Sequence, residues 1–72
     1  MADCQYISMV DRLLSDIAPI KHKLKIKQHL LATDVFQEAH GEFRFEISVC
    51  TDHSKSRGML KDKIKEIANG LG

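Results

Sequence analysis

The feature that most constrains the fold of this chain is the alternation of apolar and polar residues over positions 43–51. Phe43, Phe45, Ile47 and Val49 occupy every second position, and the residues between them are polar. A period of two in aromatic and β-branched residues is typical of a β-strand with one face on a core. The sequence therefore predicts a half-buried strand here, against which the other elements pack.

An amphipathic helix is predicted before this strand, over residues 4–18. Its apolar stripe consists of Tyr6, Ile7, Val10, Leu13, Leu14 and Ile17. Asp3 has a short acceptor side chain that suits an N-cap. Pro19 disfavours the helical conformation of Ala18 and removes one backbone donor, so we expect the helix to end there.

A second amphipathic helix is predicted over residues 55–69. Its stripe recurs at spacings of four, three and four, through Leu60, Ile64, Ile67 and Leu71. Asp52 or Ser54 is the expected N-cap. Gly70 is expected to end the helix in the left-handed conformation, which a residue without a Cβ adopts at little cost.

The segment that follows the first helix admits two interpretations. As a strand, residues 21–29 place four lysines and a histidine on one side and Leu24 and Ile26 on the other. As a helix, Ile20, Leu24 and Leu31 share a stripe and Ile26 lies apart from it. The alternation of basic and apolar residues favours the strand.

A β-hairpin turn is expected between this segment and the strand at residues 43–51. Residues 30–36 continue as extended chain, with a change of apolar phase that predicts a bulge or a break, and hence two or three strands. Residues 38–42 form the turn, in which Gly41 adopts positive φ. A two-residue turn would point Asp34 into the core, whereas a three-residue turn keeps it on the solvent face. We favour the three-residue turn, because burying an unpaired carboxylate is costly.

The order helix, strand, strand, helix predicts an α+β fold in a single domain, residues 1–72. The helix–β-hairpin–helix chain (α-β-β-α) forms two layers, with both helices on one face of a small antiparallel sheet, because the hairpin offers the one apolar surface that both helices need. The open sheet edges favour pairing with a second copy into a homodimer, while the lysine-rich strand opposes such pairing. Both outcomes stay open.

Charge and composition narrow the function. The chain has 72 residues, 11 basic and 10 acidic side chains, and a formal net charge of +1. This balance disfavours nucleic-acid binding by bulk charge. No apolar run is long enough for a membrane span and no secretory leader precedes the first helix, so we expect a cytoplasmic protein without membrane contact, whose Cys4 and Cys50 thiols are reduced.

Residue patterns that indicate metal binding or catalysis are weak. Cys50 and His53 have the spacing of half a zinc site, but the sequence offers no second half, so no metal and no cofactor are expected. A Cys50 thiolate activated by His53 has little room for a water-excluding cleft on so small a scaffold. Neither HExxH nor a glycine-rich nucleotide loop occurs. We therefore expect no enzymatic activity and no catalytic residues.

Binding residues are expected in three groups. The basic row is Lys21, Lys23, Lys25, Lys27 and His29. The acidic group near the turn is Glu38, Glu42 and Glu46, and Asp34 adds a further negative charge at the same end. The N-terminus of the second helix carries Ser54, Lys55, Ser56 and Arg57. Free amides and the helix dipole favour an anion at that end.

These groups predict a small non-enzymatic protein-interaction module: a regulator, inhibitor or adaptor that binds a partner protein. The hairpin is basic at its open end and acidic near its turn. These opposite charges would orient that partner, and they also support head-to-tail self-association. The alternative is a nucleic-acid-binding module that uses the basic row and the N-terminus of the second helix. Its affinity would fall steeply between low and physiological salt.

Overall fold

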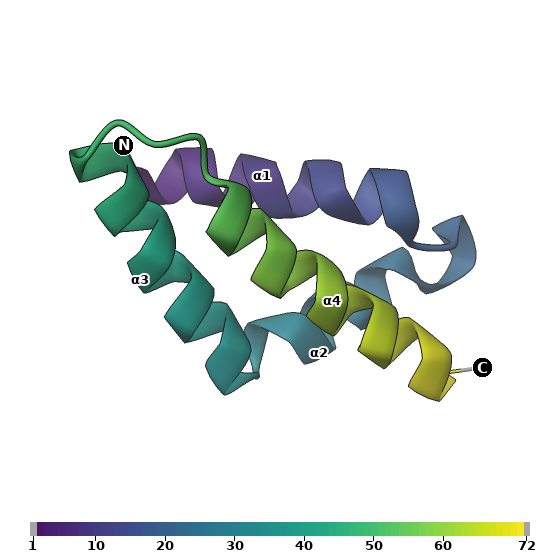
Figure 1. The fold of residues 1–72 in the computed structure, drawn as a ribbon. Helices are drawn as coiled ribbons and strands as arrows, with labels where there is room; N and C mark the ends of the chain where they lie inside the picture. Colours follow the sequence, from purple (N-terminus) through teal and green to yellow (C-terminus); the bar gives the residue numbers. More distant parts are fainter. Residues whose placement is uncertain (1, 72) are drawn as a thin grey trace.

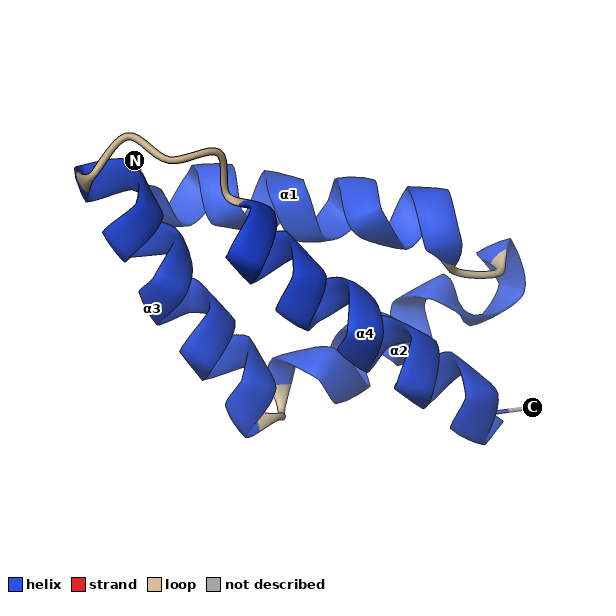
Figure 2. Cartoon of the chain, viewed as in Figure 1, coloured by secondary structure: helices blue, strands red, loops and turns tan. Residues whose placement is uncertain are grey.

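The computed structural model describes residues 2–71, with side chains from Tyr6 onward, and it is a bundle of helices (Figure 1). Its elements are α1 (Ala2–Ile17), the 3₁₀ helix η1 (Ile20–His22), α2 (Lys23–Leu31), α3 (Asp34–Ser48) and α4 (Ser54–Leu71). Figure 2 shows helices joined by short loops, and no strand within the described part of the chain. The predicted α+β fold is therefore wrong, together with its hairpin, sheet edges and strand register.

The two terminal helices are the part of the prediction that the structure confirms. The periodicity predicted them over residues 4–18 and 55–69, and both regions are helical. The extended backbone of Pro19 (φ −59°, ψ 138°) separates α1 from η1. The predicted stop at Gly70 is wrong, because α4 continues to Leu71. The side chains of Asp3 and Cys4, an expected cap and an expected free thiol, lie outside the described residues.

The residues expected to form a turn and a strand form the single helix α3. Thr33 caps it, because the Thr33 Oγ1 accepts a hydrogen bond from the Phe36 amide at 3.1 Å. The inward face of α3 consists of Phe36, Ala39, Phe43 and Glu46, which recur at spacings of three and four. Phe45, which the strand placed beside Phe43, is 60% exposed. The helix therefore separates residues that a strand would have placed on one face.

The basic segment forms the helix α2 rather than a strand. Ile26 and Leu30, four residues apart, are fully buried, whereas Leu24 is 70% exposed. Leu24 and Ile26 thus lie on different sides of the helix, although a strand would have placed them on the same side. The Thr33 amide donates to the Leu30 carbonyl at 3.0 Å and closes the last turn before α3 begins.

The core lies between all four helices, and α4 packs more extensively against each of the others than they pack against one another. Its Leu60 and Ile64 are fully buried. The remaining buried apolar residues are Tyr6, Val10, Leu13, Leu14, Ile26, Leu30, Phe36, Ala39 and Phe43. A chain of this length buries a modest core, so each of these side chains matters for stability.

Tyr6 connects α1 to α3. Its hydroxyl donates to the Phe36 carbonyl at 3.0 Å, and its ring lies against those of Phe36, His40 and Phe43, with centroid separations of 4.7 to 5.3 Å. Aromatic pairs at these distances add to the stabilisation by burial. Burial also raises the pKa of Tyr6 from 10.0 to about 12, because the phenolate loses its hydration.

Alkaline titration is expected to report this burial directly. The phenol ionises with a pKa of about 12 in the folded chain and 10.0 in the unfolded chain, so the stabilisation it provides is complete below pH 10 and is lost as the pH rises toward 12. Because the chain has one Tyr and no Trp, phenolate absorbance reports this residue alone. We expect its midpoint near pH 12 in native buffer and near pH 10 in denaturant. Equal midpoints in the two conditions would contradict a buried phenol.

Gly41 lies in the middle of α3, where no other group lies within 4 Å of the position that a Cβ would take. Gly41→Ala is therefore expected to raise the free energy of unfolding by about 0.5–1 kcal/mol, since alanine loses less backbone entropy on forming a helix. Thermal denaturation followed by circular dichroism measures the effect. Gly58→Ala, at an equally open helical position, should act in the same direction. A loss of stability in Gly41→Ala would instead indicate the left-handed turn predicted from the sequence.

Candidate functional site

The loop between α3 and α4 brings a buried carboxylate to the N-terminus of α4. Cys50 and His53 both have positive φ, of 60° and 63°, and the chain turns back on itself between them. The Asp52 Oδ1 accepts a hydrogen bond from the Ser54 amide at 3.1 Å. Hydrogen bonds from Ser54 hold the pKa of Asp52 below its usual value. This loop therefore supplies one acceptor for the free amides of α4.

Glu46 supplies the second acceptor. Its Oε1 accepts from the Ser56 amide and its Oε2 from the Ser56 hydroxyl, both at 3.0 Å. Glu46 and Ser56, both predicted from the sequence to bind a partner, are 5% and 0% exposed and lie inside the fold. At the helix end where the sequence predicted an anionic ligand, the structure places the carboxyl group of Glu46.

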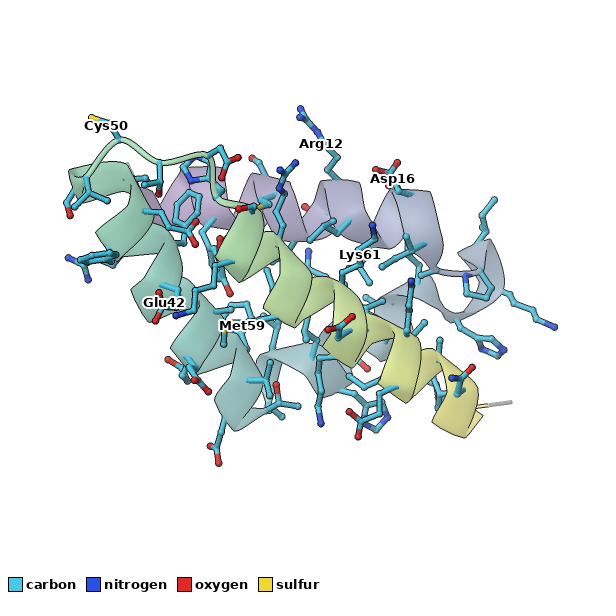
Figure 3. The ribbon with its side chains drawn as sticks, viewed as in Figure 1. Arg12, Asp16, Glu42, Cys50, Met59 and Lys61 are labelled. Carbon is cyan, nitrogen blue, oxygen red and sulfur yellow. The ribbon has the colours of Figure 1, made fainter. Side chains whose placement is uncertain are left out.

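His53 lies beside this pair. Its Nδ1 is 3.7 Å from the Glu46 Oε2, and its ring lies 4.8 Å from that of Phe43. The Nδ1 is buried and makes no hydrogen bond to a residue that the structure describes. Cys50, the expected zinc partner of His53, carries a free, exposed thiol that extends from the loop (Figure 3). Within the described residues, no group of three or more His, Cys, Asp or Glu side chains is placed to hold a metal.

The remaining residues predicted at this end are exposed. Ser54, Lys55 and Arg57 all face solvent. The Lys55 Nζ lies 3.4 Å from the Glu42 Oε1, an ion pair that joins α4 to α3. Glu42 is labelled on α3 in Figure 3. Such partly exposed pairs contribute little to stability. Glu42, which the sequence predicted to bind a partner, thus already contacts Lys55 within the fold.

The helix α2 divides the predicted basic row among its sides. The Lys23 Nζ contacts the Ser15 Oγ at 3.2 Å and the Lys27 Nζ contacts the Asp11 carboxylate at 2.7 Å, so both side chains turn toward α1. The other three members, Lys21, Lys25 and His29, are exposed. A strand would have aligned all five, whereas the helix leaves no continuous row.

Three exposed apolar residues form what we call the α2 stripe: Ile20, Leu24 and Leu31. They are 87%, 70% and 39% exposed. The spacing of seven places Leu24 and Leu31 on one side of α2, and Ile20 of η1 lines the same hollow as Leu24. This hollow of about 380 Å³ lies between α2 and α1, with Leu14 among its lining residues. The helical interpretation of this segment had grouped these three residues into one stripe from the sequence.

A second exposed stripe runs along α3 and consists of Asp34, Glu38, Phe45 and Val49. Phe45 and Val49 are 60% and 48% exposed, and both acidic residues face solvent. Spacings of four, seven and four keep the four residues on one side of the helix. This α3 stripe is acidic at its N-terminal end and apolar at its C-terminal end.

A groove of about 530 Å³ separates α1 from the α3–α4 loop and the start of α4. Its apolar lining is Met9, Leu13 and Phe43, its charged lining is Arg12, Asp16, Asp52 and Arg57, and the ring of His53 also faces it. Figure 3 shows Arg12 and Asp16 on α1, and Lys61 of α4 lines an adjoining hollow. Because both signs of charge alternate around it, the groove favours no single class of charged ligand.

No helix within residues 2–71 combines the length and the hydropathy needed to cross a bilayer. No protein-family model, curated protein or solved structure matches this chain.

Proposed function

We propose that this chain is a cytoplasmic, non-enzymatic protein-interaction module, a regulator, inhibitor or adaptor that binds a partner protein through the α2 stripe. The observation that carries the proposal is the exposure of Ile20 and Leu24, at 87% and 70%, on neighbouring turns of the chain. Adjacent large apolar side chains on a small protein mark an interaction site more often than scattered ones do.

The energetics support binding at this stripe. Burying a fully exposed leucine or isoleucine side chain contributes about 1.5–3 kcal/mol, so Ile20 and Leu24 together supply several kcal/mol on contact with an apolar surface. The adjoining hollow between α1 and α2 gives a partner side chain a place to insert. A few residues that fill well-packed pockets account for most of the affinity in protein interfaces.

The stripe is also held rigidly. Ile26 and Leu30 anchor α2 in the core, and the contacts of Lys23 with Ser15 and of Lys27 with Asp11 fasten it to α1. A surface already in its bound conformation loses less entropy on association.

The charges beside the stripe indicate what the partner carries. Lys21 and Lys25 follow Ile20 and Leu24 directly, and neither makes a hydrogen bond or ion pair with a residue in the described range. A partner with an apolar patch and acidic side chains at its rim complements this surface.

Leu24→Glu is expected to abolish partner binding without unfolding the chain. The variant places a carboxylate at the centre of the stripe, and its matched control, Gln37→Glu, adds the same charge at an exposed position of α3. Quantitative cross-linking and mass spectrometry of tagged wild type and both variants, with nucleic acid recovered in parallel, measures the loss. A partner that is lost with Leu24→Glu and kept with Gln37→Glu is the expected result. Equal capture by both variants, or salt-sensitive recovery of nucleic acid alone, would overturn the proposal.

A further inference from the structure

We draw no further inference here: the strongest candidate, the α3 stripe with its exposed Phe45 and Val49, is an unpartnered apolar helix face, and nothing in the part of the chain that the structure describes shows what covers it.

Discussion

Ile26→Glu is expected to unfold this protein, whereas Leu24→Glu, two residues away, leaves its stability nearly unchanged. Ile26 is 0% exposed and belongs to the core, so the variant buries a carboxylate that has no partner there. That change costs more than about 4 kcal/mol, which is close to the whole stability of a small domain. Leu24 is 70% exposed, and a helix-forming glutamate at that position changes the free energy of unfolding by less than about 0.5 kcal/mol.

Urea denaturation followed by far-ultraviolet circular dichroism measures both variants on one scale. Wild type and Leu24→Glu should unfold at similar midpoints, and Ile26→Glu should lack a cooperative transition in dilute buffer. Ile26→Val serves as the conservative control and should cost about 0.5–1.5 kcal/mol. Similar losses in Leu24→Glu and Ile26→Glu would put both residues on one face, as in the strand predicted from the sequence.

The terminal helices could be predicted because each carries its complete signal within itself. In α1, residues from Tyr6 to Ile17 recur at helical spacing and Pro19 follows, so the pattern and the stop agree. In α4, Leu60 and Ile64 of the predicted stripe are fully buried, and Ile67 and Leu71 are partly buried against the same core. Consistent local signals of this kind do not depend on what the rest of the chain does.

The central strand was predicted wrongly because its alternation has a second explanation. Phe43 and Ile47 are four residues apart and lie on the inward side of α3, while Phe45 and Val49 are four apart and face solvent. Two apolar helix faces, offset by two residues, imitate the period of a strand. The strand prediction rested on the assumption that apolar residues are buried, and the exposed apolar face of this helix contradicts that assumption.

The segment that forms α2 was wrongly predicted as a strand for the same reason. The helical interpretation was weighed with Ile20, Leu24 and Leu31 as the buried stripe, and that stripe is present but faces solvent. The buried residues are Ile26 and Leu30, which no single-period pattern singled out. In both helices the misread feature is an exposed apolar stripe, and the α2 stripe is the surface to which we assign binding.

The N-terminus of α4 shows a different limit of prediction from the sequence. Ser56 and Glu46 were both singled out from the sequence, but for separate surfaces, and their contact joins residues ten apart across a loop. Two positive φ values, at Cys50 and His53, make that return possible, and neither residue is a glycine that would have signalled it. The periodicity of apolar residues cannot predict a polar pair that lies between two inward faces.

Glu46→Ala is expected to lower the free energy of unfolding by about 2–4 kcal/mol. The Ser56 amide loses its acceptor and stays buried, and the positive end of α4 loses a charge that compensates it. The Ser56 hydroxyl keeps one alternative, since it also donates to the His53 carbonyl at 3.1 Å, so the amide carries most of the cost. Urea denaturation of the variant against wild type gives the difference.

Two further variants separate the buried cap from general loss of charge. Glu42→Ala removes a carboxylate from the same helix, where its ion pair with Lys55 is partly exposed, and should cost less than about 1 kcal/mol. Ser56→Ala keeps the hydrogen bond from the backbone amide of residue 56 to the Glu46 carboxylate and removes the one from the hydroxyl. Its loss in the free energy of unfolding should therefore fall between those of the other two variants. If Glu46→Ala and Glu42→Ala cost the same, the carboxylate of Glu46 does not cap α4, and the approach of α3 to that helix end needs another cause.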